Sequence, residues 1–248
     1  MTLIAHVSDT HLADDGGRSA ERAERVVRYL ERLRRPVDAV LVTGDVADHG
    51  LPAEYAAARV LGRLGVPLLQ LPGNHDERSA FRQSLLGAPP EPGPVDQVAR
   101  VGDLVFALCD SSIPGRDDGW LADETLAWLD TVLAEGAPTF VCFHHPPVAI
   151  GHPQADLVRQ FGEDRLAAVL ARHPNVVALL CGHIHSATVG TFAGVPLLAA
   201  PGVASTLILP WEQGDGGLDR DAPPALAFHL YEDGRLITHY RSVFVVPG

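Results

Sequence analysis

Short polar motifs follow one apolar run after another along this chain, and this alternation limits how it can fold. The runs are short and rich in valine, leucine and alanine, which is typical of buried β-strands. Helical patterns separate several of them, so the sequence predicts βαβ units and a largely parallel sheet. Because the carboxyl ends of parallel strands meet at one edge, we expect the motifs to converge there. They are Asp9-Thr10-His11, Gly44-Asp45, Gly73-Asn74-His75-Asp76, His144-His145 and Gly182-His183-Ile184-His185.

Periodicity and turn residues predict the individual elements. Val26, Val27 and Leu30 recur at helical spacing before Arg35-Pro36, and a second helix is expected between Pro52 and Gly65. We expect the strands that follow residue 187 to form a second sheet packed on the first, and we expect polar loops over residues 14–18 and 214–224. Strands are predicted over residues 3–7, 37–42, 66–71, 98–101, 104–109, 139–143, 176–181, 187–192, 195–200, 225–231 and 235–244, and helices over residues 19–33, 52–64, 78–86, 123–133 and 157–171.

The composition is that of a globular chain. Its 248 residues are 46% hydrophobic and 20% charged, which fits one domain spanning residues 1–248. No apolar run reaches the roughly 18 residues that a membrane span needs. The first residues lack the basic region and cleavage site of a signal peptide, so a cytoplasmic location is expected. Cys109, Cys142 and Cys181 are odd in number and lie in or beside apolar strands, and we expect them to be buried reduced thiols.

The charge balance narrows the class of partner. The formal net charge is −12, and the arginines between Arg22 and Arg35 are interleaved with glutamates. A duplex nucleic acid partner is therefore not expected, and neither is a membrane partner. Two divalent cations would cancel about four negative charges and leave a locally positive site. We expect the partner to be a small anionic molecule.

The residue types within the motifs indicate metal binding. Carboxylate oxygen and imidazole nitrogen suit Mn, Fe, Zn or Co. Asn74 adds a neutral oxygen where another carboxylate would overcharge the site, and Asp45 has two oxygens with which to bridge two cations. Any one motif alone is compatible with a solvated loop or a hydrogen-bonded histidine. All five in order, each after a strand, indicate a two-metal hydrolytic centre.

The remaining histidines receive structural interpretations. His6 lies inside the first strand and is expected to be a hydrogen-bonded core residue. Two others lie on late strands and are expected to be structural, and three are expected at the surface. The first pair is His229 and His239, and the surface group is His49, His152 and His173, of which His49 and His152 are close enough to the motifs to line a rim.

As a set, the five motifs resemble those of the calcineurin-like metallophosphoesterases over nearly the whole chain. Ser8-Asp9-Thr10-His11-Leu12, the segment Thr43 to Asp48, and His144-His145-Pro146-Pro147 are similar to the bacterial class III cyclic nucleotide phosphodiesterases. Glycerophosphodiesterases share these signatures. The resemblance implies an α/β (α+β) fold, a four-layer αββα sandwich of two packed mixed sheets with a dinuclear metal site at the sheet edges.

The resemblance also implies roles for the motif residues. One metal would be held by Asp9, His11, Asp45 and His185, and the other by Asp45, Asn74, His144 and His183. His75 would be catalytic and face the phosphate, with Asn74 beside it in substrate binding, and Asp45 would serve catalysis as the bridge. Asp76 would either orient His75 or cap the helix that begins near Arg78.

The implied reaction is hydrolysis of small phosphodiesters, foremost 3′,5′-cyclic nucleotides to 5′-monophosphates, by attack of a metal-bridging hydroxide. Alternative activities with the same site are those of a phosphomonoesterase, a glycerophosphodiesterase or a nucleotide pyrophosphatase. A nuclease is disfavoured by the acidic surface, and a non-catalytic scaffold by the complete ligand set. The loop over residues 208–221 is expected to cover the site, with Trp120, Phe143 and Trp211 available as an aromatic clamp, and the family suggests a homodimer.

Overall fold

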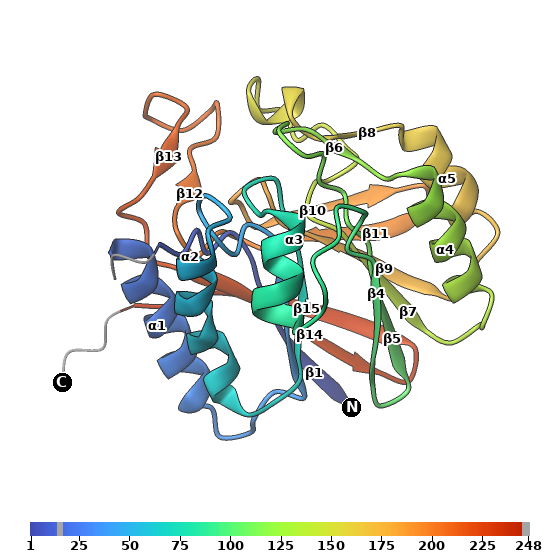
Figure 1. Cartoon of the computed structure of the whole chain (residues 1–248), viewed down its shortest axis with the longest axis horizontal. Helices are drawn as coiled ribbons and strands as arrows, with labels where there is room; N and C mark the ends of the chain where they lie inside the picture. Colours follow the sequence, from blue (N-terminus) through green and yellow to red (C-terminus); the bar gives the residue numbers. More distant parts are fainter. Residues whose placement is uncertain (14–16, 245–248) are drawn as a thin grey trace.

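The fold is described from a computed structural model, which covers residues 1–13 and 17–244. Most of the polar loop predicted over residues 14–18 therefore lies outside the described residues. Two larger sheets occupy the middle of the molecule, with α1, α2 and α3 on one side and α4 and α5 on the other (Figure 1). In the described part of the chain, no helix is both long and apolar enough to cross a membrane.

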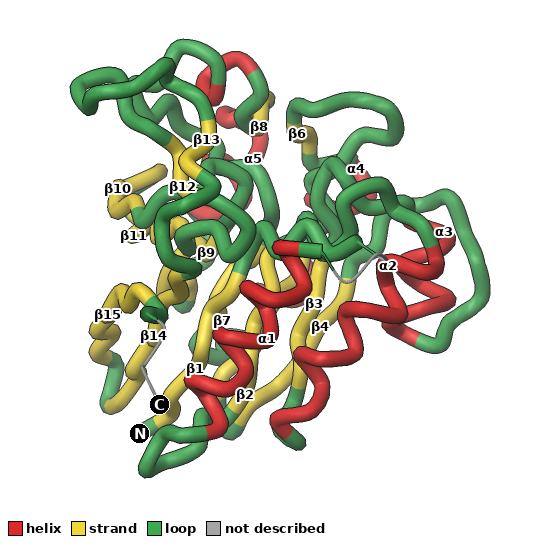
Figure 2. Tube along the Cα trace, turned by 90° about the vertical axis from the view of Figure 1, so that its left-hand side faces the viewer, coloured by secondary structure: helices red, strands yellow, loops and turns green. Residues whose placement is uncertain are grey.

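The first sheet has the strand order β15-β14-β1-β2-β3. Its three parallel strands come from the first part of the chain, and two antiparallel strands from the end of the chain join it beside β1. Figure 2 shows α1 in front of β1 and β2. The strands are β1 (Thr2–Val7), β2 (Ala39–Thr43), β3 (Leu68–Leu71), β14 (Ala225–Glu232) and β15 (Arg235–Ser242), and the helices are α1 (Arg18–Glu31), α2 (Pro52–Ala57) and α3 (Arg78–Phe81).

The second sheet has the order β10-β11-β9-β7-β5-β4, in which the four strands from β11 to β5 run parallel. Two pairs of short strands lie beyond the sheets in the upper half of Figure 1, β12 with β13 on the side of α1 and α2 and β6 with β8 on the side of α4 and α5. Figure 2 also shows them in its upper half. The bounds are β4 (Gln97–Val101), β5 (Leu104–Leu108), β6 (Gly119–Trp120), α4 (Asp123–Leu133), β7 (Thr139–Cys142), β8 (Gln160–Phe161), α5 (Glu163–Leu170), β9 (Val176–Cys181), β10 (Thr188–Phe192), β11 (Val195–Ala199), β12 (Thr206–Leu207) and β13 (Leu218–Asp219).

Three apolar clusters hold the layers together. One lies between the first sheet and its helices, with Val26 and Val27 of α1 against Val40 and Val42 of β2. A second joins the two sheets, and a third joins the second sheet to α4 and α5. The central strands of each sheet are therefore buried on both faces, which explains why they are continuous apolar runs, whereas the edge strands β4, β10 and β15 are partly exposed. The predicted four-layer αββα sandwich with two mixed sheets is confirmed.

Three sequence predictions of local structure need correction. The late strands do not form a sheet of their own, because β14 and β15 extend the first sheet while β10 and β11 extend the second. The helix predicted over residues 157–171 begins only at Glu163, because residues 155–157 form a 3-10 turn and β8 follows it. The polar loop predicted over residues 214–224 contains β13.

The helices after β2 and β3 also depart from the predicted regular form. The segment from Pro52 to Leu64 is α-helical only as far as Ala57 and continues as a 3-10 helix (η1, Ala58–Leu64), and α3 continues as a π-helix (η2, Arg82–Leu86). Gly65 ends η1 in the left-handed conformation, with φ 68°, as its place after the last apolar residue predicts. The buried cysteines are free thiols, as expected.

A polar chain runs across four strands of the first sheet, on the face that packs against the second sheet. His6 Nδ1 lies 2.9 Å from His229 Nε2, His6 Nε2 lies 2.8 Å from Thr43 Oγ1, and His229 Nδ1 lies 2.8 Å from Thr238 Oγ1. Thr43 in turn donates to Ser8. If each group donates toward Ser8, every bond is made with both rings neutral. The expectation that His6 and His229 are satisfied core histidines is confirmed, whereas His239 is exposed.

Neutral buried histidines make the fold sensitive to acid. Burial lowers the pKa of His229 to about 3, and burial together with His229 lowers the pKa of His6. In an unfolded chain a histidine has a pKa near 6.5, so between about pH 3 and 6.5 the unfolded state binds more protons. Stability is therefore complete above that window and falls as the pH drops through it.

We predict that His229→Gln weakens this acid sensitivity, because glutamine keeps a donor and an acceptor but does not titrate. The free energy of unfolding is measured in urea at about pH 7.5 and about pH 5, on protein treated with a chelator to remove metal. Its decrease between the two pH values should be roughly 2 kcal/mol smaller in the variant than in the wild type. His239→Gln on the neighbouring strand is the matched control and should behave as wild type. An equal pH dependence in all three proteins would contradict the neutral-pair interpretation.

Candidate metal centre

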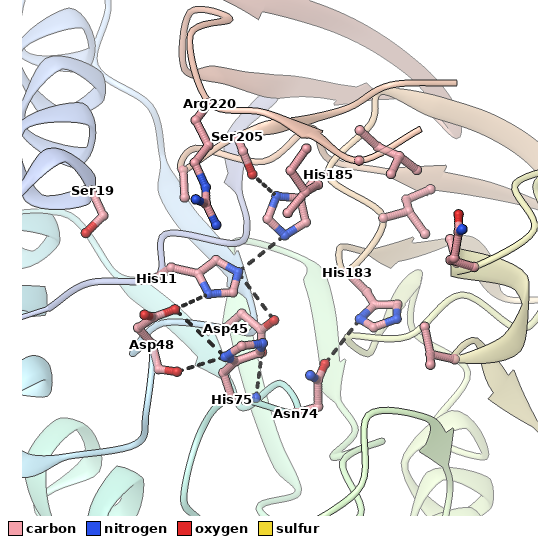
Figure 3. Close-up of a pocket in the computed structure, with 18 of the residues that line it drawn as sticks. His11, Ser19, Asp45, Asp48, Asn74, His75, His183, His185, Ser205 and Arg220 are labelled. Carbon is pink, nitrogen blue, oxygen red and sulfur yellow. Dashed lines mark hydrogen bonds and ion pairs between the residues drawn. The ribbon is translucent and has the colours of Figure 1, made fainter. Parts of the chain in front are cut away.

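The structure brings the seven predicted ligands together at the carboxyl ends of five strands. Asp9 and His11 follow β1, Asp45 follows β2, Asn74 follows β3, His144 follows β7, and His183 and His185 follow β9. The first three strands are parallel within one sheet and the last two within the other, so both sheets present their carboxyl ends to the same place. Five of them, His11, Asp45, Asn74, His183 and His185, are labelled side by side in the close-up of the cavity (Figure 3).

Most of these residues have an unusual backbone conformation. Five of them have positive φ values: Asp9 (54°), His11 (42°), Asp45 (48°), His183 (68°) and His185 (48°). In the described chain the other non-glycine residues with positive φ are Ala193 and Asp233, which lie in hairpin turns. Such conformations cost about 1–3 kcal/mol each and gather at functional sites. The loops are thus folded to aim these side chains inward at the expense of local backbone energy.

Three histidines are oriented in a common way. His11 Nδ1 lies 3.0 Å from Asp48 Oδ1, His144 Nδ1 donates to the Thr43 carbonyl at 2.7 Å, and His185 Nδ1 lies 2.8 Å from Ser205 Oγ. In each case Nδ1 is occupied by a protein group and Nε2 faces the other predicted ligands. Metal-binding histidines are held by outer partners of this kind, which fix the ring and its tautomer.

Asp45 lies between two groups of these side chains. Its Oδ2 is 3.2 Å from His144 Nε2 and 3.6 Å from His11 Nε2, while its Oδ1 accepts from the backbone N–H of His75 at 3.0 Å. On the side of His11, potential ligand atoms of Asp9, His11 and His185 cluster together, and Asp9 also clusters with Asp45 and His144. A carboxylate in this position can reach two cations at once.

The electrostatics of the site fit a bound cation. His144 Nε2 is buried and makes no hydrogen bond within residues 1–13 and 17–244, although Asp45 and Asp9 oxygens lie 3.2 and 4.0 Å away. Burial opposes protonation of His144, but these carboxylates outweigh it and raise its pKa to about 9. In return, His144 outweighs the effect of burial on Asp45 and holds its pKa well below the usual range. The site thus favours positive charge at an imidazole nitrogen, which a divalent metal ion supplies when it replaces the proton.

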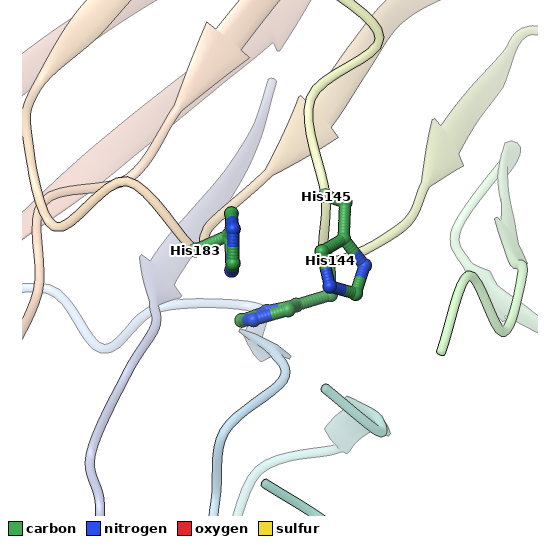
Figure 4. Close-up of side chains that lie close together, drawn as sticks. All are labelled: His144, His145 and His183. Atoms are coloured by element: carbon green, nitrogen blue, oxygen red, sulfur yellow. The ribbon is translucent and has the colours of Figure 1, made fainter. Parts of the chain in front are cut away.

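The second side of the site is built around His183. Burial and the neighbouring His144 lower the pKa of His183 to about 3, so its ring is a neutral potential ligand. Its Nδ1 lies 3.1 Å from Asn74 Oδ1. Figure 4 shows His183 close to both His144 and His145. The donors on this side carry no negative charge apart from Asp45, as expected for a site that avoids excess negative charge.

His145 differs from its neighbour in its contacts. Its Nδ1 lies 2.9 Å from Ser111 Oγ, and its Nε2 lies 3.2 Å from the Asp117 carbonyl. Burial and the nearby His183 hold its pKa well below the usual range. Because both nitrogens have protein partners, the geometry favours His144 over His145 as the ligand of this pair. His145 instead joins the loop around Asp117 to the wall of the site.

Asp48 and Asp76 have roles that the sequence interpretation did not identify. Asp48 contacts His11 through its carboxylate, and its carbonyl lies 2.8 Å from His75 Nδ1. Asp76 neither orients the His75 ring nor caps a helix, so both predicted roles are wrong. It accepts from the backbone N–H groups of Val46, Ala47 and Gly73, and burial together with Asp45 raises its pKa to about 6. The cap of α3 is Glu77, which accepts from Ser79 and Ala80.

The ligand cluster lines a cavity of about 900 Å³. Its walls include the segment from Asp215 to Leu218 and Arg220, so the loop over residues 208–221 does flank the site as expected. The prediction of an aromatic clamp beside the site is wrong. Trp120, Phe143 and Trp211 do not line this cavity; Phe143 is buried in the core and Trp120 stacks under Arg165.

Two of the histidines predicted at the surface, one of them in the cavity wall, need correction. His152 is buried, with its Nε2 2.9 Å from the Gly216 carbonyl, and it lines the cavity wall. His173 is half-buried beside Asp130, whereas His49 is exposed as expected. Ser205, Asp48 and Arg220 are among the polar cavity residues that sequence reasoning missed. Asp48 belongs to a quoted motif, but serine and arginine in the late loops carry no local signal.

Glycines allow the close packing of the ligand loops. A Cβ on Gly73 would lie 2.1 Å from Asp45 Oδ1 and 2.5 Å from the Asp45 nitrogen. Neither group can move without displacing the carboxylate between the two ligand groups. Gly190 on β10 serves as a comparison, because a Cβ added there would meet no atom within 4 Å.

We predict that Gly73→Ala displaces Asp45 and loses bound metal, while Gly190→Ala retains it. Elemental analysis after dialysis against Mn²⁺ should find at least tenfold less metal in Gly73→Ala. A tenfold decrease in affinity corresponds to the removal of one ligand contact worth about 1.4 kcal/mol. Circular dichroism should show that both variants are folded. Full metal content in Gly73→Ala would contradict the predicted place of Asp45.

Comparisons with known proteins agree with this geometry. A family model described as calcineurin-like phosphoesterase matches residues 2–187. The chain is 34% identical to a glycerophosphodiester phosphodiesterase of Enterobacter lignolyticus, over 99% of this chain and 93% of the relative. It is 35% identical to a 3′,5′-cyclic adenosine monophosphate phosphodiesterase of Pseudomonas aeruginosa, over 95% of this chain and 88% of the relative. A dimetal phosphatase from Danio rerio shares the fold with a TM-score of 0.71 at 19% identity, over 98% of this chain and 96% of the other.

Proposed function

The chain belongs to the calcineurin-like phosphoesterase family, and we propose that it hydrolyses 3′,5′-cyclic nucleotides to 5′-monophosphates at a dinuclear metal centre. Members of this family are metal-dependent phosphoric ester hydrolases with two divalent metal ions. The observation that carries the proposal is the place of Asp45, which is buried between two groups of imidazole and carboxylate donors. It lies beside His144 Nε2, which makes no hydrogen bond in the part of the chain that the structure describes.

The proposed ligands divide into two sets that share Asp45. Two cations held there would supply an activated water at neutral pH and Lewis acids for the phosphoryl oxygens. The metal ions are drawn from Mn, Fe, Zn and Co, because the nitrogen and oxygen donors suit all four. The first set is Asp9, His11, Asp45 and His185, and the second is Asp45, Asn74, His144 and His183.

His75 is the proposed proton donor to the leaving oxygen. It lines the cavity, and its Nδ1 donates to the Asp48 carbonyl at 2.8 Å. That bond is kept in both the neutral and the protonated ring, so Nε2 is the atom that gains and loses the proton. Asp48 thus orients the ring so that, in its protonated form, Nε2 can give its proton to the leaving oxygen and become neutral. Asn74, the neighbour of His75 in the chain, is also proposed to contact the substrate phosphate.

The size of the cavity and the relatives support a small substrate. A volume of about 900 Å³ lies at the upper end of ordinary ligand pockets and leaves room for a nucleotide. A glycerophosphodiester is the second candidate, because a glycerophosphodiester phosphodiesterase is 34% identical over 99% of the chain. Both substrates are monoanionic diesters, and they differ in the bulk of the leaving group.

A substrate panel tests the proposed reaction. With Mn²⁺, we expect turnover of bis-p-nitrophenyl phosphate and of 3′,5′-cAMP, and slower turnover of p-nitrophenyl phosphate and single-stranded DNA. A higher kcat/KM for a glycerophosphodiester than for 3′,5′-cAMP would move the assignment to the second candidate. Inactivity on the whole panel with two equivalents of metal bound would contradict an enzymatic role.

We predict that His75→Ala keeps both metal ions but lowers kcat by roughly 10²–10⁴-fold, the usual contribution of acid–base catalysis. The measurement is kcat on 3′,5′-cAMP combined with elemental analysis of the same sample. His49→Ala is the control, because His49 is a neighbouring histidine whose side chain is 68% exposed. Loss of metal in His75→Ala would show that this residue is a ligand instead.

A further inference from the structure

One wall of the cavity is attached to α1 by a buried arginine. The Arg22 side chain donates from Nε to the Val203 carbonyl at 2.6 Å, from Nη1 to the Arg220 carbonyl at 3.2 Å, and from Nη2 to the Ala222 carbonyl at 2.6 Å. Arg22 is only 3% exposed. Its guanidinium therefore binds backbone on both sides of the loop over residues 208–221 and fixes where that loop returns to the sheet.

Two further contacts fix the backbone around Arg220. Asp219 Oδ1 accepts from the N–H groups of Asp221 at 2.7 Å and Ala222 at 3.0 Å, which closes a turn. Asp221 also pairs with Arg18 at the start of α1, at 2.6 Å. The residues on both sides of Arg220 are thus occupied in holding the loop. Arg220 contributes its carbonyl to this anchor and leaves its side chain available for another task.

The Arg220 side chain extends into the cavity. Figure 3 shows it running from the loop toward His11 and His185, and all three residues line the same space. Within the described parts of the chain, its guanidinium makes no hydrogen bond or ion pair, whereas Arg18 pairs with Asp221 and Arg63 with Glu24 and Glu31. With 31 acidic residues against 19 basic ones, a cavity arginine without a carboxylate partner is unexpected.

The charges in the cavity indicate what this guanidinium binds. A cation that faces a site for two divalent metal ions is repelled by them until an anion lies between. A phosphoryl group is such an anion, and the planar fork of arginine matches its oxygens. Resting on the proposed function, we propose that Arg220 donates to a non-bridging oxygen of the scissile phosphoryl group and so makes substrate binding and turnover depend on this loop.

The test compares Arg220→Gln and Arg220→Lys with Arg235→Gln, an exposed residue of β15 that changes the net charge equally. On bis-p-nitrophenyl phosphate, which has a single phosphate, kcat/KM should fall roughly 10- to 100-fold in Arg220→Gln, as expected for one charge-assisted hydrogen bond. Lysine should give an intermediate loss, and Arg235→Gln none. In a further variant, Arg220→Ala, guanidinium chloride at millimolar concentration should restore part of the lost activity.

A second readout does not depend on turnover. Calorimetric titration of the Mn²⁺-loaded proteins with inorganic phosphate should show a similar loss of affinity in Arg220→Gln, with unchanged melting temperature and metal content. If wild-type protein turns over no substrate, the proposed function fails, and the phosphate titration still decides the role of Arg220. Equal phosphate affinity in Arg220→Gln and wild type would overturn the proposal. So would a loss of activity confined to substrates with a second phosphate, because Arg220 would then bind that group.

Discussion

The structure depends on a buried cluster of carboxylate and imidazole groups around Asp45, which the fold holds away from water. Asp9 and Asp45 are buried beside His144, whose Nε2 lies 4.0 Å and 3.2 Å from their oxygens and makes no hydrogen bond within the described residues. Without positive charge such a group of acceptors is costly, and this cost is seen in the raised pKa of His144. Two divalent cations satisfy the same atoms, so metal binding and the folded shape of the loops support each other.

The rest of the fold serves to hold these loops. Parallel strands from two sheets end at the same place, and helices on the outer faces leave the strand ends accessible. Each ligand loop is then tied to another loop by a buried contact, such as the Asp76 carboxylate that joins the turn after β2 to the turn after β3. Gly73 lets the Asp45 carboxylate approach at a distance that no side chain allows. Rigid support compensates for the left-handed backbone at five ligand positions.

Much of this arrangement was predictable from the sequence, because it rests on patterns that are local. Apolar runs marked the strands, and the motifs after them identified the seven side chains that the fold gathers. The pairing of the late strands was not predictable, since β10 and β14 are both apolar strands beside hairpin turns and only tertiary packing assigns them to different sheets. The sequence predicts too long a helix before β9, because Leu157 and Val158 continue its apolar spacing. In the structure the helix starts only after Gly162, which has a left-handed conformation.

The roles that sequence reasoning missed depend on distant partners. Asp76 accepts from backbone groups about thirty positions earlier, and no local pattern distinguishes that role from a helix cap. Arg220 is placed by Arg22, which lies 198 residues away in the chain. Ser205 orients His185 from a loop without a motif. Contacts of this kind decide which nitrogen of each histidine faces the cavity, and they appear only when the chain is folded.

The proposed chemistry requires Asp45 to lie between two metal ions. Anomalous diffraction from crystals grown with excess Mn²⁺ would locate those ions relative to its carboxylate. We predict two anomalous peaks on opposite sides of Asp45, one beside His11 and His185 and the other beside His144 and His183. One peak, or none within coordination distance of Asp45, would contradict this placement.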